Sequence, residues 1–482
     1  MTRSRNIEKR FYQQLAVLRG QNRLFDGQET IWIARSPGRL DFMGGNVDYT
    51  GGLVLQLPLR EGIHAAAQSS AEPVIRIFNH GAVLHGWASE IAFPIAQLGD
   101  LQALTAVCSE ERGTRWGRYV LGAFHALHVH HGAFQRHGAR LYLDSTLPAN
   151  RGVGSSAALE ISVLKAAAAV AGVRLEGVAL AEAGQWVENV VAQSACGIMD
   201  QAACVIGEQG CLLPLLCQPC QPEPPLALPD GVRIWGIDSL ASRSTTSAAY
   251  ESARAAAFMG YRMLCQWEGL ALTPEHNGRI PRWTDPRWNG YLSNLRPSEL
   301  RARHLDRLPE SMRGSDFLRL YTEHVDPFTS VAPDDWYPVR AAVLYACEEH
   351  LRIEIARALL QGMHQDMSLH RLESQLRMLG ELMHQSHHAY AECGLGATSC
   401  DILVELAQHH GLYGAKMTGG GGGGVVALLG TAGQEDAVRA VAAEYAQHCG
   451  IAPHIFTDSS DGADLSGVTV WEAEAALGAG MP

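Results

Sequence analysis

Residues 147–160 bring glycine, serine and alanine together in an order that could hold a phosphate group. Gly152 and Gly154 precede Ser155 and Ser156, which open an alanine-rich run that predicts a helix. Glycines let the backbone approach an anion, and the free N–H groups and dipole of a helix start favour negative charge. A serine there could also bind Mg²⁺. The residues predicted to bind phosphate are Gly152, Val153, Gly154, Ser155, Ser156 and Ala157. A serine N-cap after a glycine turn is the alternative, and the GK[ST] ending of a Walker P-loop is missing.

Two further segments place acidic and basic side chains where they could serve the same chemistry. Glu188 follows on a predicted helix, and Asp200 comes just after a glycine break. Two acids near a phosphate loop suggest a metal ligand and a general base. Arg39 and Asp48 share a tight glycine-rich loop, where they could hold sugar hydroxyls and balance developing charge. Taken singly, the acids could be solvated helix-face residues, and the Arg39 loop could be a surface turn with a salt bridge.

Six consecutive glycines, residues 419–424, follow Thr418 between two strand-like segments. Glycine loses more backbone entropy on folding than any other residue, so such a run inside a domain implies close packing against a ligand or another backbone. The alternative is a flexible linker, which would lie between domains with serine nearby.

The remaining pattern predicts the elements that position these motifs. Strands are expected at 30–34, 53–57, 140–145 and 232–237, and helices at 6–19, 157–171, 180–191, 246–266, 338–361 and 368–391. Residues 217–229 contain five prolines, leave no room for regular structure and mark a domain boundary. We therefore expect an N-terminal domain at 1–225 and a C-terminal domain at 226–482. Residues 273–335 form an excursion from the second domain, and the tail after Asp458 is expected to be loose.

Composition limits the classes of function. The chain has 482 residues, 47% of them hydrophobic, enough for two or three domains. Its formal net charge of −12 argues against a nucleic-acid surface, which needs clustered Lys and Arg. The apolar helix at 157–173 carries Glu160 and Lys165 and does not fit a membrane span. We expect a cytoplasmic protein that binds small molecules, not nucleic acid or membrane; the oligomeric state is not visible.

In this order, the motifs resemble the GHMP kinase superfamily and specifically its galactokinase-like branch. The matching segments are residues 35–49 (galactokinase signature), 152–158 (phosphate loop), 197–201 (Gly-Ile-Met-Asp-Gln) and 416–424 (C-terminal glycine motif). The resemblance implies an α+β, two-domain fold with the active site in the cleft between the domains. It further implies an ATP- and Mg²⁺-dependent kinase that phosphorylates the anomeric hydroxyl of a monosaccharide.

The resemblance also implies roles for single residues. Asp200 matches the catalytic aspartate and Arg39 its arginine partner. Ser156 and Glu188 match the Mg²⁺ ligands, and Arg243 matches a basic residue near the sugar. The residues implied to bind the sugar are Asp48, Asn46, Gly45, Gly197 and Tyr250, and those implied for the glycine-rich motif are Thr418, Gly419, Gly420 and Gly421.

One departure from the family bears on the substrate. Galactokinases read Gly-Glu-His-Thr-Asp-Tyr where residues 44–49 read Gly-Gly-Asn-Val-Asp-Tyr, so the Glu and His that grip the C6 hydroxyl are gone. L-Arabinose has the ring stereochemistry of galactose without that group. Residues 37–41, 43–45, 53–56, 233–239, 393–396 and 413–416 likewise resemble the kinase half of plant L-arabinokinases. The expected product is L-arabinose 1-phosphate. A small pocket at Gly45 could admit another C6 group, so galactose and galacturonate stay open, as does a non-catalytic sugar and ATP sensor.

Overall fold

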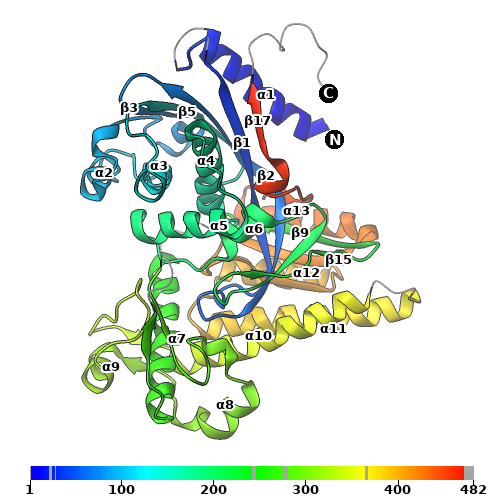
Figure 1. Cartoon of the computed structure of the whole chain (residues 1–482). Helices are drawn as coiled ribbons and strands as arrows, with labels where there is room; N and C mark the ends of the chain where they lie inside the picture. Colours follow the sequence, from blue (N-terminus) through cyan, green and yellow to red (C-terminus); the bar gives the residue numbers. More distant parts are fainter. Residues whose placement is uncertain are drawn as a thin grey trace.

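The computed structural model describes residues 2–20, 24–27, 29–241, 246–275, 280–363 and 367–471, and Figure 1 shows their helices arranged around two larger β-sheets. The α+β class predicted from the sequence is confirmed. No helix in these ranges is long and apolar enough to cross a membrane.

The larger sheet has nine strands within the described ranges, in the order β17-β1-β2-β5-β3-β4, with β6 beside β2 and both β7 and β8 beside β6. Its long antiparallel strands β1 (Ile31–Met43) and β2 (Leu53–Ser70) flank the predicted glycine-rich turn and run well past the short strands expected there. The other strands are β3 (Val74–Asn79), β4 (Glu90–Pro94), β5 (Gly138–Ser145), β6 (Cys211–Leu216), β7 (Gln221–Pro222), β8 (Leu226–Ala227) and β17 (Val468–Trp471).

Helix α4 (Ser155–Ala171) packs against both β1 and β2, and its alanines allow a close approach to the sheet. The predicted helix at 180–191 is present as α5 (Gly177–Trp186) and a π-helical segment, η3 (Val187–Val191). The neighbouring helices are α1 (Thr2–Gly20), α2 (Leu101–Val107), α3 (Gly117–His131) and α6 (Met199–Ile206).

The smaller sheet has the strand order β14-β15-β9-β16 and carries the glycine run between its first two strands. These strands are β14 (Gly414–Met417), β15 (Val425–Thr431), β9 (Val232–Asp238) and β16 (Ile455–Phe456). Helices α11 (Leu369–Glu392) and α12 (Thr398–His409) pack on β14, with α10 (Val339–Gly362) beside α11 and α13 (Glu435–Cys449) beside α12 (Figure 1).

The excursion at 273–335 folds against α7 (Thr246–Trp267) and α10 around an apolar cluster of its own. Figure 1 shows α7, α8 and α9 grouped at the lower left, below the large sheet. The elements of this region are β10 (Thr273–Glu275), β11 (Arg282–Thr284), α8 (Pro297–Arg303), β12 (Met312–Arg313), α9 (Gly314–Tyr321) and β13 (Trp336–Tyr337).

Two predictions of irregular structure were wrong. The proline-rich segment contains β7 and β8, each a two-residue strand paired with β6. Strand β7 includes Pro222, which a short strand at the edge of a sheet tolerates. The tail after Asp458 contains α14 (Ala463–Ser466) and β17, which adds to the edge of β1 with Val468 opposite Ala34. Nothing near β17 in the sequence indicates this partner, which lies more than 400 positions away. The domain division at residue 225 stays a prediction.

Candidate active site

Arg39 and Asp200 form a bidentate ion pair between the large sheet and helix α6. The Arg39 Nε atom donates to Asp200 Oδ1 at 2.9 Å and Nη2 donates to Oδ2 at 2.7 Å. The Arg39 side chain is 3% exposed and that of Asp200 22%. Burial alone would lower the pKa of Arg39, but the Asp200 and Asp41 carboxylates raise it above its ordinary value. The pair is therefore a fixed cation beside a carboxylate that solvent or a substrate can reach.

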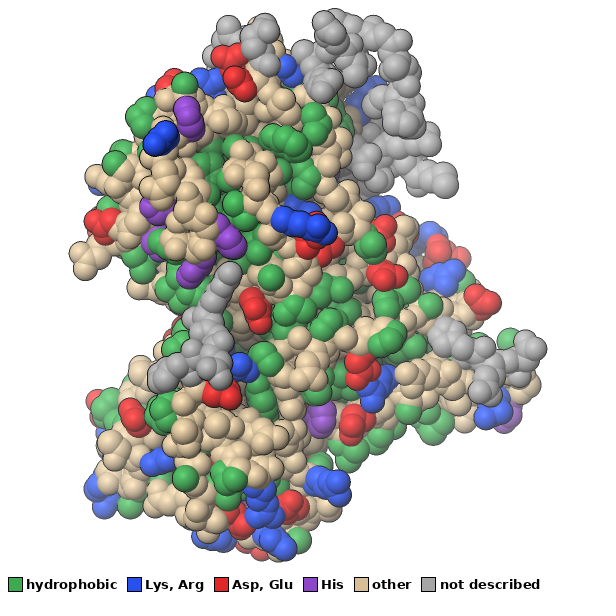
Figure 2. Space-filling model, viewed as in Figure 1, with side chains coloured by type: hydrophobic (Ala, Val, Ile, Leu, Met, Phe, Trp, Pro, Cys, Tyr) green, Lys and Arg blue, Asp and Glu red, His purple; other side chains and the backbone are tan. Residues whose placement is uncertain are grey.

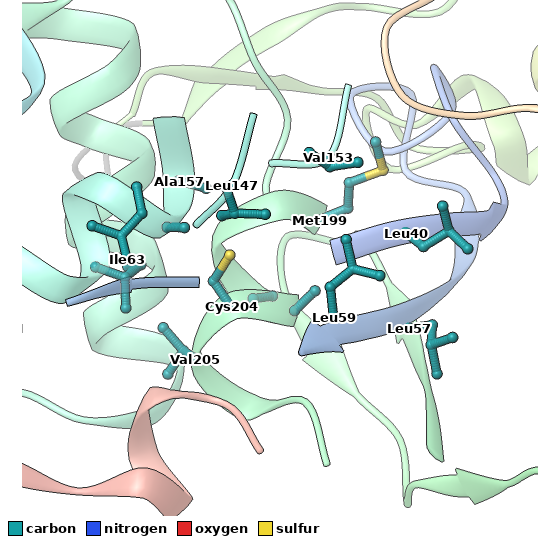
Figure 3. Close-up of a cluster of buried hydrophobic side chains, with 14 of the residues drawn as sticks. Leu40, Leu57, Leu59, Ile63, Leu147, Val153, Ala157, Met199, Cys204 and Val205 are labelled. Atoms are coloured by element: carbon teal, nitrogen blue, oxygen red, sulfur yellow. The ribbon is translucent and has the colours of Figure 1, made fainter. Parts of the chain in front are cut away.

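An apolar cluster holds this pair in place. Leu40 follows Arg39 on β1, and Met199 precedes Asp200 on α6. Figure 3 shows these two side chains in one buried apolar cluster with Val153 of the phosphate loop and Ala157 of α4. All four side chains are at most 6% exposed. Because such tight packing resists shifts of the backbone, it fixes the relative positions of the two charged residues.

The predicted phosphate loop has the expected geometry. Helix α4 begins at Ser155, and Gly152 and Gly154 adopt positive φ angles of 73° and 68°, which glycine tolerates best. The loop is also tied to the ion pair. The Arg39 N–H donates to the Val153 carbonyl at 2.9 Å, and Arg39 Nη1 donates to the Gly152 carbonyl at 2.5 Å. The start of α4 therefore presents its free N–H groups beside Arg39 and Asp200.

The glycine run packs against this loop and is not a linker. A Cβ on Gly419 would lie 2.8 Å from the Gly152 carbonyl oxygen, and one on Gly424 would lie 2.5 Å from that of Arg151. Thr418 is fully buried, and its hydroxyl donates to the same Gly152 carbonyl at 3.4 Å. Gly419 and Gly421 have positive φ angles, whereas Gly420 lies between them, partly exposed. Close approach of two backbones explains why side chains are missing here.

Glu188 lies in η3 and shares a buried hydrogen-bond network with Gln201 and Glu160. Gln201 Nε2 donates to Glu188 Oε2 at 2.7 Å and to Glu160 Oε2 at 3.2 Å. Burial and the Asp200 carboxylate raise the pKa of Glu188 to about 7, and burial and Glu188 raise that of Glu160. The Ser156 hydroxyl is within hydrogen-bond reach of Glu188.

These oxygen ligands fit Mg²⁺, which in kinase sites is held by one or two protein groups together with phosphates and water. Ser156 and Glu188 would supply the protein ligands. Within the described ranges, no group of three or more His, Cys, Asp or Glu side chains could hold a metal ion on its own. A Mg²⁺ ion held by Ser156 and Glu188 would take its remaining ligands from phosphates and water.

Asp48 lies near Asp200 and packs directly against Gly197. The Asp48 carboxylate accepts from the Tyr49 N–H at 2.9 Å and from the Met199 N–H at the start of α6. A Cβ on Gly197 would lie 1.9 Å from Asp48 Oδ2, so only glycine leaves this carboxylate its place. Tyr250 packs edge-on against Tyr49 with ring centroids 5.8 Å apart. The structure thus brings Asp48, Gly197 and Tyr250 together, whereas Arg243 lies outside the described residues.

The ionisation of Asp48 should make sugar binding depend on pH. Burial and the Asp200 carboxylate raise the pKa of Asp48 to about 6. A carboxylate accepts hydroxyl hydrogen bonds best when ionised, and only about one tenth of it is ionised at pH 5 against about nine tenths at pH 7. We expect the KM for sugar to fall by up to about tenfold between pH 5 and pH 7, with the KM for ATP followed in parallel. In the Asp48→Asn variant the sugar KM should be high at both pH values; a wild-type KM that does not change with pH would contradict this role.

Asn46 lies on the same turn with a positive φ of 60° and is 3% exposed. Neither polar atom of its amide has a hydrogen-bond partner within the described part of the chain. A buried amide without partners is costly, so a polar ligand would satisfy it. This observation fits the predicted role of Asn46 at a sugar site.

The space expected beside Gly45 is filled. A Cβ on Gly45 would lie 2.0 Å from the Tyr390 hydroxyl oxygen and 2.6 Å from Asp41 Oδ2. Tyr390 is 1% exposed and donates to the Gly419 carbonyl at 2.6 Å, while Tyr345 donates to the Gly45 carbonyl at 2.7 Å. The predicted small pocket at Gly45 was therefore wrong, because α10 and α11 supply tyrosines that occupy it.

The sequence did not single out several residues of this site. Tyr345 and Tyr390 carry no motif and lie about 300 and 345 positions after Gly45, so no local pattern connects them to it. Arg254 lies on α7 four residues after Tyr250, and this spacing, which places both on one helix face, was the signal that could have drawn attention to it. Lys416 and Asp41 are fully buried and lie 3.4 Å apart beneath Gly45.

Comparison with known families agrees with this geometry. The chain matches the galactokinase galactose-binding signature at residues 22–69, the GHMP kinases N terminal domain at 118–208 and the GHMP kinases C terminal domain at 367–447. The fold matches Lactococcus lactis galactokinase complexed with galactose, with a TM-score of 0.70, 21% identity and coverage of 96% of this chain and 99% of that one. A mevalonate kinase gives a TM-score of 0.54 at 13% identity over 89% and 99% of the two chains. The chain belongs to the GHMP kinase superfamily.

Within this superfamily the chain is similar to sugar kinases of the galactokinase and L-arabinokinase type. It is 32% identical to L-arabinokinase of Arabidopsis thaliana over 495 residues, which cover 92% of this chain and 47% of that protein. It is 29% identical to galactokinase of Chloroflexus aurantiacus over 251 residues, 52% of this chain and 60% of that one. The chain thus spans about half the length of these curated relatives.

Proposed function

We propose that this protein transfers the γ-phosphate of ATP to the anomeric hydroxyl of a monosaccharide. The observation that carries the proposal is the bidentate Arg39–Asp200 pair, tied by Arg39 to the carbonyls of the phosphate loop. A base, a fixed cation and a helix start for phosphate are the parts that phosphoryl transfer needs, since positioning and charge stabilisation supply most of its catalysis.

In the proposed reaction, Asp200 takes the proton of the C1 hydroxyl as that oxygen attacks the γ-phosphorus. The bond between the γ-phosphorus and the bridging β–γ oxygen breaks, and ADP leaves. Arg39 orients Asp200 and balances the charge that develops on the transferring group. Bound Mg²⁺, held by Ser156 and Glu188, would neutralise charge on the phosphate oxygens.

We further propose L-arabinose as the substrate. The filled space beside Gly45 supports this choice, because a glutamate at this position would collide with the Tyr390 hydroxyl. A pentopyranose has no C6 hydroxyl and needs no partner for one. A site without that partner does not strongly reject galactose, but it gains no binding energy from the C6 hydroxyl of galactose. Galactose and galacturonate are the alternative substrates.

The test is a comparison of kcat/KM for L-arabinose, D-galactose and D-galacturonate with ATP. We expect L-arabinose to give the highest value, and phosphorus NMR to show a sugar 1-phosphate. The Asp200→Asn variant, purified in the same way, serves as the control for contaminating kinases. A preference for galactose over arabinose by more than about tenfold would exclude the pentose assignment.

A further inference from the structure

A cavity of about 260 Å³ lies beside Asp48 and Gly197, and the excursion at 273–335 forms its far wall. The excursion contributes Trp283, Asp326 and Phe328, and α7 contributes Arg254. The surface in Figure 2 is indented on the left between the part that carries α2 and α3 and the part that carries α9. The excursion therefore forms part of the sugar side of the candidate active site.

Arg254 is held rigidly in this wall. Its Nε and Nη2 atoms donate to the two carboxylate oxygens of Asp326, both at 2.8 Å. The guanidinium carbon lies 5.0 Å from the ring centre of Tyr49 and 5.7 Å from that of Phe328. Arg254 is 4% exposed, so its position depends on these contacts and not on solvent.

The third nitrogen of this guanidinium, Nη1, is buried and makes no well-aligned hydrogen bond within the described residues. The Tyr250 hydroxyl is within hydrogen-bond reach of the guanidinium, so Tyr250 and a ligand oxygen could share this side of Arg254. Asp326 is also fully engaged, because it accepts from the Thr329 hydroxyl at 2.6 Å as well. A buried donor of a charged group without a partner is expensive, and an oxygen of a ligand would satisfy it.

The cavity is lined by Arg254, whose guanidinium is a charged donor, and by Asp48, whose carboxylate is an acceptor. Neighbouring ring hydroxyls of a pyranose can accept from the first and donate to the second. Asp326 already balances the charge of Arg254, and a uronate would add a negative charge near Asp48 and Asp326. The chemistry favours a neutral sugar.

We propose that Arg254, held by the excursion through Asp326, binds a ring hydroxyl of a neutral monosaccharide. This inference rests on the proposed function and assigns the excursion the role of a sugar-binding wall. Asp326 is then a positioning residue, because it acts through Arg254.

The first experiment compares Arg254→Lys with the wild type. Lysine keeps a charge for Asp326 but loses Nη1, so we expect the sugar KM to rise about tenfold or more while the KM for ATP changes less than about twofold. Arg313→Lys is the matched control, because Arg313 pairs with Asp334 on the exposed surface of the same excursion. An ATP-induced rise in melting temperature shows that each variant is folded. An unchanged sugar KM in Arg254→Lys would overturn the proposal.

A cycle with deoxy sugars separates binding from a structural role. The wild type should bind one particular deoxy analogue much more weakly than the intact sugar. The Arg254→Lys variant should bind that analogue and the intact sugar with nearly equal affinity. Equal and additive losses would mean that Arg254 supports the fold and does not touch the hydroxyl.

A crystal structure of the wild type with the sugar and a non-hydrolysable ATP analogue gives an answer independent of any variant. We expect the Arg254 guanidinium within hydrogen-bond distance of a hydroxyl oxygen on the sugar ring, and a sugar seated elsewhere would overturn the inference. Failure of the proposed function would appear differently, as a wild type that phosphorylates none of the sugars tested.

Discussion

Replacing Asp200 with Asn is expected to lower kcat by about 10²–10⁴-fold, the usual contribution of a general base. The amide keeps the size of the side chain and one acceptor for Arg39, but it cannot take the proton of the sugar hydroxyl. ATP binding should persist, because the phosphate loop contacts Arg39 and not Asp200. Turnover measured by ADP release and nucleotide affinity measured by calorimetry check the two halves of this prediction.

The matched control is Asp458→Asn, which alters an ion pair with Arg60 at the protein surface and should leave kcat unchanged within about twofold. If Asp200→Asn turned over at the wild-type rate, the assignment of the base would be refuted. A wild-type protein that binds sugar and ATP without turnover would instead indicate a non-catalytic sugar and ATP sensor.

Replacing Gly197 with Ala is expected to cost at least about 100-fold in kcat/KM for the sugar, because a displacement of about 1 Å at a reacting site can have this effect. The added methyl would lie 1.9 Å from Asp48 Oδ2, so the carboxylate has to move. Gly197 does not have a positive φ, so alanine is compatible with the backbone. The main loss should therefore appear in sugar binding, and the free energy of unfolding should fall only by the cost of displacing Asp48, about 1–3 kcal/mol.

Gly433→Ala provides the control, since a Cβ at Gly433 would meet no heavy atom within 4 Å and its φ is not positive. Steady-state kinetics and urea unfolding of both variants decide the point. If Gly197→Ala kept the wild-type sugar KM, Asp48 would not be the sugar-binding carboxylate.

Local sequence was sufficient to predict those parts of the site whose chemistry depends on the conformation of a short stretch of backbone. The phosphate loop was predictable because glycines before a serine-started helix create an anion site within ten residues. The pairing of Arg39 with Asp200 came from resemblance alone, as the two residues are separated by 161 positions.

The parts that could not be predicted depend on packing between distant segments. The departure from the galactokinase signature at Gly45 was visible in the sequence. The Tyr390 hydroxyl that fills the space beside Gly45 comes from α11, and no sequence motif marks this tyrosine. Strand β17 and the Arg254–Asp326 pair were missed for the same reason, because pairing over long sequence separations leaves no local period.

The Gly152 carbonyl accepts from both Arg39 and Thr418, and Tyr390 joins Gly419 to the turn at Gly45. The sugar turn, the phosphate loop and the glycine run are thus fastened to one another from three separate stretches of chain. Parting them would break several buried contacts at once. The catalytic centre would therefore stay assembled between turnovers, while substrates bind and products leave.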